Sequence, residues 1–223
     1  GDDVAFERVF SVLESVVKTP GFNGSRDGAM NLTQFSGPGM NGALDLNPAV
    51  GNAYGQLPPG VYFDGGSFTV ESWVYVRSHR NWARLFDFGV GPLTDVVAMS
   101  LSTATDGKPA FVTQSGNTGI NVSAPNALPL NQWVHLAVVF TAGSGTGTGT
   151  IYFDGVSQVS QTGMALPRNL TRANAWVGRS NWFTDAYPDA KFDNFRIWSI
   201  ARTPAQLAEG MTNLYSAGTA GLR

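Results

Sequence analysis

Two stretches of the sequence combine aromatic rings with hydrogen-bonding side chains at close spacing. The longer one covers residues 179–189, and the shorter one, residues 77–82, ends on a tryptophan. Aromatic faces can stack on the C–H surfaces of sugar rings, while nearby polar groups bind the hydroxyls. The chemistry that these stretches could perform is therefore sugar binding. The candidate ligand-binding residues are Arg179, Asn181, Trp182, Asp185, Tyr187 and Trp82.

The elements that must position these residues are predicted to be strands. Residues 67–76 alternate strictly, with Phe68, Val70 and Val74 on one face and Glu71 and Trp73 on the other, which is typical of a β-strand. Residues 133–140 are apolar on both faces, as in a central strand. Further strands are predicted over residues 43–46, 61–63, 83–88, 95–101, 109–114, 119–122, 151–156, 175–178 and 190–199.

The remaining segments carry turn and helix signals. The Gly/Thr/Ser run over residues 141–150 predicts a mobile loop, and Asp154-Gly155 predicts a tight turn. Near-helical apolar spacing predicts a helical extension over residues 1–20. A capping-box pattern predicts a short helix that starts at Thr203, and residues 211–223 read as a loose tail.

Composition excludes several classes of protein. The 223 residues include no cysteine, so thiolate metal sites, disulfides and cysteine nucleophiles are excluded. The net charge of −2 argues against a nucleic-acid partner, and the apolar runs are too short for membrane insertion. Many short strands without alternating helices predict an all-β protein, with residues 21–210 forming an antiparallel two-sheet jelly-roll sandwich.

Six motifs in order resemble those of the laminin G-like, concanavalin A-like jelly-roll domains. They are residues 68–74 (FTVESWV), 81–89 (NWARLFDFG), 132–139 (QWVHLAVV), 151–155 (IYFDG), 177–182 (VGRSNW) and 192–198 (FDNFRIW). The resemblance spans roughly residues 22–207. It implies an extracellular module of a carbohydrate-active protein. It also implies that the tryptophans and arginines of the candidate site could instead plug the sandwich edge and fix loops.

The superfamily includes glucanases, whose retaining mechanism needs two carboxylates about 5–5.5 Å apart. The chain has four glutamates, and none has a carboxylate partner within four residues on a predicted strand. Jelly-roll lyases use a Tyr/His base, but neither histidine lies in a lyase-like string. We therefore expect His135 to be a structural histidine. Glu71 is expected to pair with an arginine, either Arg84 or Arg196, rather than to act as an acid catalyst.

A structural calcium ion is implied by the resemblance to the glucanases. Asp193 matches the side-chain ligand, and carbonyls near Gly42 and Asn23 match the others. Asp185 and Asp189 form an alternative pair of oxygen ligands.

These observations favour a non-catalytic, extracellular carbohydrate-binding or adhesion module that recognises a glycan or a glycosylated surface. The alternative is a structural or protein-interaction module in which the helix over residues 1–20 docks on another protein. A polysaccharide hydrolase or lyase is the third possibility.

Overall fold

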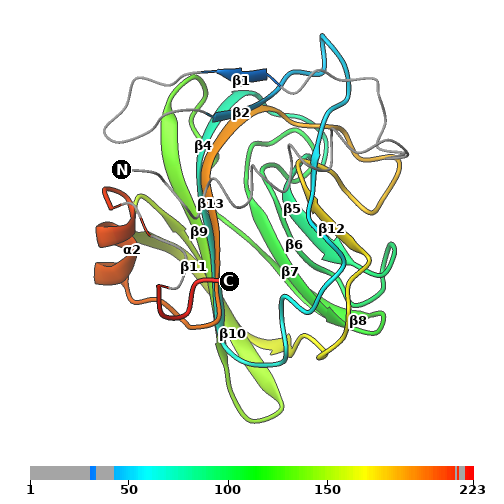
Figure 1. Ribbon diagram of the computed structural model, residues 1–223, viewed down its shortest axis with the longest axis vertical. Coiled ribbons are helices and arrows are strands. Elements are labelled where there is room, and N and C mark those ends of the chain that lie inside the picture. Colours follow the sequence, from blue (N-terminus) through cyan, green and yellow to red (C-terminus); the bar gives the residue numbers. More distant parts are fainter. Residues whose placement is uncertain (1–30, 34–42, 214, 216–218) are drawn as a thin grey trace.

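The computed structural model describes residues 31–33, 43–213, 215 and 219–223, which form a sandwich of two antiparallel β-sheets (Figure 1). The helix predicted over residues 1–20 lies outside the described residues, as do Asn23 and Gly42. Among the described residues, no helix has the length and apolar character needed to cross a membrane.

One sheet has seven strands in the order β1-β2-β13-β4-β9-β10-β11, and the other has six in the order β3-β12-β5-β6-β7-β8. The strands are β1 (Asn31–Thr33), β2 (Ala43–Leu46), β3 (Gly55–Gln56), β4 (Phe68–Ser78), β5 (Arg84–Gly89), β6 (Val97–Ser100), β7 (Ala110–Ser115), β8 (Thr118–Ser123), β9 (Trp133–Ala142), β10 (Thr146–Phe153), β11 (Val156–Ala165), β12 (Asn174–Val177) and β13 (Asp189–Trp198).

The hydrophobic core lies between the two sheets. On β4, Phe68, Val70 and Val74 belong to this core, as the alternation of the sequence predicts. The ring of Phe68 stacks on Phe140 of β9, with ring centroids 5.0 Å apart. The strand β11 contacts β7 and β8 of the opposite sheet, so the sandwich is closed along that edge.

The glycine-rich segment after β9 is not the loop that its composition predicts. The strand β9 continues to Ala142 and β10 begins at Thr146, so only three residues connect them. An added Cβ would lie 2.2 Å from the Phe140 ring at Gly147 and 2.6 Å from Met164 Sδ at Gly149. The glycines therefore make room for core side chains, and glycine in a strand often marks such a close approach.

The tight turn predicted at Asp154-Gly155 is confirmed, because both residues have positive φ, 47° and 75°, as a two-residue type I′ hairpin turn requires. The strand predicted over residues 61–63 is wrong. This segment is irregular, although Phe63 is buried in the core. Its apolar residues pack against the core but do not pair with a neighbouring strand. The strands β1, β3 and β11 were not predicted, because the first two are very short and β11 is polar and mostly exposed.

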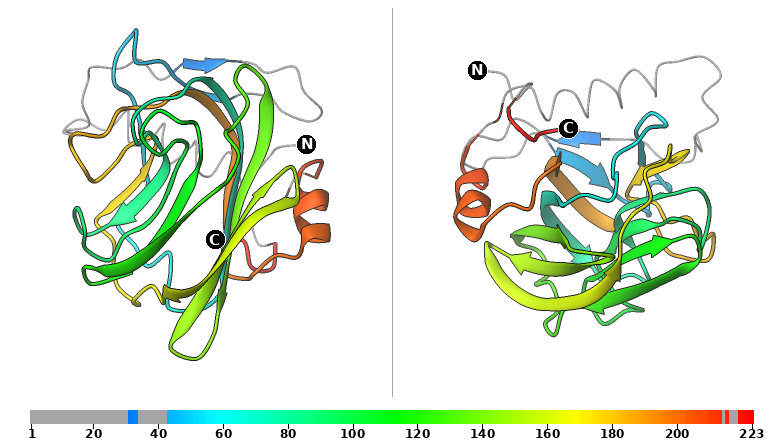
Figure 2. Two further views of the ribbon diagram at one scale, coloured as in Figure 1. Left: turned by 180° about the vertical axis from the view of Figure 1, so that it is seen from behind. Right: turned by 90° about the horizontal axis from the view of Figure 1, so that it is seen from below.

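The short helix α2 (Pro204–Gly210) lies against the outer face of the seven-stranded sheet, away from the six-stranded sheet (Figure 2). Its capping box is formed as predicted. Thr203 accepts a hydrogen bond from the Gln206 backbone, and the Gln206 side chain accepts one from the Thr203 backbone. The described part of the predicted loose tail is held in place, because the Arg223 N–H donates to the Ile197 carbonyl and Leu222 forms a bridge with Trp198.

Candidate functional site

A cavity of about 350 Å³ lies on the outer face of the six-stranded sheet. Its floor is made of small side chains, which alternate along β6 and β7 with core residues such as Met99 and Phe111. A floor of small residues leaves room for a ligand above the sheet, and larger side chains from two loops form the walls. The lining residues are Trp82, Arg84, Ala98, Ser100, Ala110, Val112, Gln114, Gly119, Asn121, Trp182 and Asp185. We call this cavity the groove.

Two tryptophans that line the groove contact a single arginine. The Arg84 guanidinium carbon lies 5.7 Å from the centroid of the Trp82 ring and 5.3 Å from that of the Trp182 ring. Such cation–π contacts hold both indoles in place. The structure thus brings together two tryptophans that are 100 residues apart in the sequence, and both line the same groove.

The backbone at Trp82 is strained. Its φ of 53° lies in the left-handed region, which is a genuine outlier for a bulky residue. The Trp82 N–H donates to the Ala104 carbonyl, and the adjacent Asn81 carbonyl accepts from Ala186 of the other loop. Strain of this kind costs about 1–3 kcal/mol and concentrates at functional sites. The neighbouring contacts therefore hold Trp82 in a position that it would not adopt alone.

Arg84 is anchored from below by two carboxylates. Its Nη2 donates to Asp185 Oδ2 at 2.9 Å, and its Nε donates to Asp87 Oδ2 at 3.3 Å. Asp87 is fully buried, and this burial raises its pKa although Arg84 and hydrogen bonds from Asn181 oppose the shift. One arginine faces two carboxylates, so the base of the groove carries no excess positive charge.

The loop over residues 179–187 divides its predicted ligand residues between two roles. Asn181 is a positioning residue, because its side chain donates to Asp87 Oδ1 at 2.7 Å and accepts from Asn174. Arg179 and Tyr187 lie on the far side of the loop from the groove, where they line a second hollow of about 140 Å³. Trp182 and Asp185 line both cavities.

Sequence reasoning missed Arg84 as a groove residue. It assigned Arg84 as a possible partner of Glu71, which is wrong, because Arg84 binds Asp87 and Asp185 on the other sheet. The signal was present in the Asn81-Trp82-Ala83-Arg84 string, where a tryptophan precedes the arginine by two residues. The small floor residues carried no chemical signal of their own.

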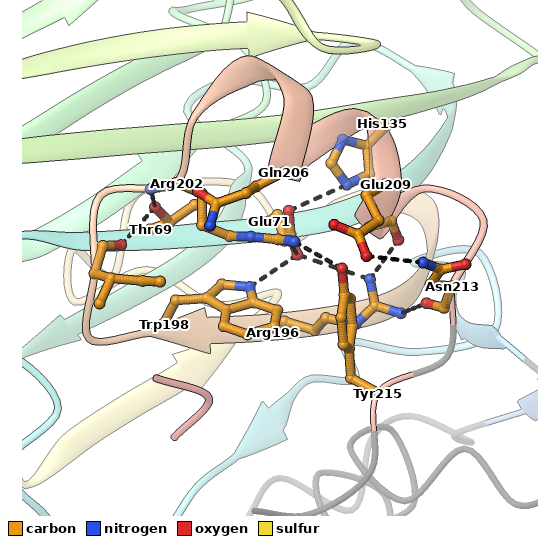
Figure 3. Close-up of polar contacts among 12 residues, drawn as sticks. Thr69, Glu71, His135, Arg196, Trp198, Arg202, Gln206, Glu209, Asn213 and Tyr215 are labelled. Carbon is orange, nitrogen blue, oxygen red and sulfur yellow. Dashed lines mark hydrogen bonds and ion pairs between the residues drawn. The ribbon is translucent and has the colours of Figure 1, made fainter. Parts of the chain in front are cut away.

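Glu71 lies at the centre of a buried cluster between the seven-stranded sheet and α2 (Figure 3). Its Oε1 accepts from Arg202 Nη1 at 2.6 Å and from Trp198 Nε1 at 2.8 Å. Arg196 Nη1 lies 3.7 Å from the same oxygen, so the predicted pairing with Arg196 is confirmed. Burial raises the pKa of Glu71, against the effect of both arginines. The carboxylate is closed off from solvent and cannot contact a polysaccharide in this conformation.

His135 faces the same cluster from β9. Its Nε2 lies 3.6 Å from Glu71 Oε2, its ring contacts Trp73 edge-on, and it is 1% exposed. Burial, together with the positive charges of Arg196 and Arg202, lowers the pKa of His135 to about 3. The imidazole is therefore neutral and enclosed.

This pKa predicts a pH-dependent stability. Between the unfolded value of 6.5 and the folded value of about 3, the unfolded chain binds a proton that the folded chain does not. Lowering the pH from about 7 to about 5 is therefore expected to reduce the free energy of unfolding by about 2 kcal/mol through His135. Denaturant unfolding at several pH values measures it. His135→Gln should show a correspondingly flatter dependence than wild type. Parallel curves for wild type and His135→Gln would contradict the prediction.

The predicted calcium ligands are only partly described. Asp193 lies on β13, 2% exposed, and its Oδ1 accepts from the Asn194 N–H at 2.7 Å. The described residues contain no cluster of three or more histidine, aspartate or glutamate side chains suited to a metal ion. In the alternative pair, both carboxylates bind arginines, Asp185 to Arg84 and Asp189 to Arg77. Calcium at Asp193 stays a prediction.

The chain belongs to the concanavalin A-like lectin/glucanase superfamily, because a family model of that superfamily matches residues 50–208. No curated protein sequence matches the chain significantly.

Many solved structures share the fold, among them the following three. Domain 4 of AbnA, an extracellular GH43 arabinanase from Geobacillus stearothermophilus in complex with arabinotriose, is 22% identical with a TM-score of 0.63, covering 82% of this chain and 81% of that one. A SAP-like pentraxin from Limulus polyphemus is 17% identical with a TM-score of 0.51, covering 75% and 77%. A proposed carbohydrate-binding protein from Bacteroides ovatus is 18% identical with a TM-score of 0.52, covering 76% and 46%.

Proposed function

We propose that this protein is a non-catalytic carbohydrate-binding module whose ligand lies in the groove. The observation that carries the proposal is the pair of tryptophans, Trp82 and Trp182, which contact Arg84 and line the groove above a floor of small residues. Indole faces stack on sugar rings, and Gln114 and Asn121 line the groove with amide groups that can bind hydroxyls. An extracellular location, as in the arabinanase to which AbnA domain 4 belongs, accompanies this function.

The charges of the groove favour a neutral sugar. Arg84 is the only cation among the described residues that line the groove, and Asp185 and the underlying Asp87 more than balance it. An acidic sugar placed on this floor would face the Asp185 carboxylate, and it would have to compete with Asp185 and the buried Asp87 for Arg84. Neutral hydroxyls, in contrast, can bind to the amides and to the arginine without displacing an ion pair.

The absence of catalysis is part of the proposal. Among the described residues that line the groove, Asp185 is the one carboxylate, and it is held by Arg84 and by the Ser180 hydroxyl. Retaining and inverting glycosidases both need a pair of carboxyl groups that flank the glycosidic bond. Asp87 does not supply the second group, because it is fully buried beneath the arginine.

A panel of neutral and acidic oligosaccharides that includes arabinotriose tests the function. Wild type is expected to bind at least one neutral oligosaccharide, and Trp82→Ala should weaken that binding by at least about tenfold, because one stacking surface is worth about 1–3 kcal/mol by the analogy of base–aromatic stacking. The matched control is Trp133→Ala. Trp133 and Tyr75 pack against each other on the seven-stranded sheet, whereas the groove lies on the six-stranded sheet.

The outcomes are distinct. Equal binding by wild type and Trp82→Ala would place the ligand elsewhere, and no binding to any neutral oligosaccharide would refute the function. Incubation of the bound oligosaccharide with wild type should release no shorter products; cleavage that is lost in Asp185→Asn would show an enzyme instead.

A further inference from the structure

The second hollow lies directly beyond the wall of the groove. Trp182 and Asp185 line both cavities, so a single loop separates them. On the far side the hollow is lined by Arg179, Phe183 and Tyr187. A glycan chain that leaves the groove past Trp182 would therefore reach this hollow without a gap.

The hollow presents an aromatic surface to solvent. Phe183 is 98% exposed, which makes it the most exposed large hydrophobic residue of the described chain. A fully exposed phenylalanine contributes nothing to the core, whereas its open ring face is available for stacking on a sugar.

Arg179 supplies the positive charge of the hollow. Asp185, which also lines it, is held by Arg84 and by the Ser180 hydroxyl. The Arg179 guanidinium lies in the corner formed by two rings that meet edge-on, with its central carbon 4.1 Å from the Trp176 centroid and 4.5 Å from the Tyr54 centroid. Arg179 forms no hydrogen bond and no ion pair with any described residue, so none of those residues uses its five N–H donors. This differs from Arg84, whose charge is balanced by two carboxylates.

Resting on the proposed function, we infer that this hollow is a second subsite that binds an acidic sugar unit, attached to the neutral unit held in the groove. The planar guanidinium of Arg179 matches a carboxylate with two parallel N–H···O bonds, and its contacts with two rings restrict its motion before the ligand arrives. Phe183 stacks on the same sugar unit. The ligand class is thus a mixed glycan in which a uronic acid neighbours a neutral sugar.

The test compares two ligands. One is the neutral oligosaccharide that binds best on the panel, and the other is the same oligosaccharide with the primary alcohol of one terminal sugar oxidised to a carboxylate, prepared for each end in turn. Wild type is expected to bind one of the two acidic forms about fivefold more tightly, as a partly exposed ion pair allows. The gain should diminish at high salt.

Variants assign the gain to the hollow. Arg179→Gln should abolish the gain and leave affinity for the neutral ligand unchanged, and Phe183→Ala, which cannot disturb the core, should reduce it. Arg223→Gln removes the same charge from a site bound to Asp64 and serves as the control. The second subsite is refuted if wild type binds the neutral ligand but binds neither acidic form more tightly. It is also refuted if the tighter binding of the acidic form survives Arg179→Gln. Loss of neutral binding itself would instead refute the proposed function.

Discussion

Replacing Glu71 by alanine is expected to lower the free energy of unfolding by about 3–5 kcal/mol, because removing one partner of a buried ion pair leaves the other charge uncompensated. Glu71 is fully buried, and Arg202 and Arg196 beside it are 3% and 1% exposed at their side chains. The Trp198 N–H would also lose its acceptor. Since Arg202 lies next to the N-cap of α2, the loss should release the helix from the sheet before the core opens.

Denaturant unfolding measures this effect. Glu209→Ala is the matched control, because Glu209 is exposed on α2 and its change should alter stability by less than about 0.5 kcal/mol. Glu71→Gln keeps an acceptor for Trp198 and Arg202 and should lie between the two. If Glu71→Ala were as stable as Glu209→Ala, the cluster would not be what holds α2 in place.

Replacing Arg84 by leucine is expected to lower the free energy of unfolding by about 3 kcal/mol or more and to weaken binding of the neutral oligosaccharide. Asp87 is fully buried and would lose its cation, and Asp185 would lose its partner. Trp82 and Trp182 would lose the guanidinium that both contact. Stability and binding should therefore fall together.

A double variant separates these two consequences. In Arg84→Leu/Asp87→Asn the unpaired buried charge is removed, so most of the stability should return. Binding should stay weak, because nothing then fixes the two indoles. Full recovery of binding in the double variant would show that Arg84 supports the fold and plays no part in holding the groove.

Several structural elements could be predicted because their signals are local. The alternation of β4, the positive-φ turn at Asp154-Gly155 and the capping box at Thr203 each depend on residues within one element or one turn. The loop predicted at the glycine-rich start of β10 was wrong because the deciding signal there is not local. Composition alone favours a loop there, but Phe140 and Phe111 occupy the space that side chains at Gly147 and Gly149 would need.

The sequence predicted several residues of the candidate site, but it did not predict how they are arranged. Trp82 and Trp182 do line the groove, whereas Arg179 and Tyr187 lie beyond its wall and Asn181 holds Asp87. The partner of Glu71 was predicted as Arg84 or Arg196. Only the strand order shows that Arg84 belongs to the opposite sheet.

The sequence by itself determined the all-β sandwich, its family and the residue types available for sugar binding, because periodicity, turn residues and motif order are properties of short segments. Only the tertiary structure decided which of those residues share a cavity, which arginine is paired with carboxylates and which, Arg179, has no such partner among the described residues. The reason is that pairing between sheets and loops is set by contacts about 100 residues apart, as between Arg84 and Asp185, and such contacts leave no pattern along the chain.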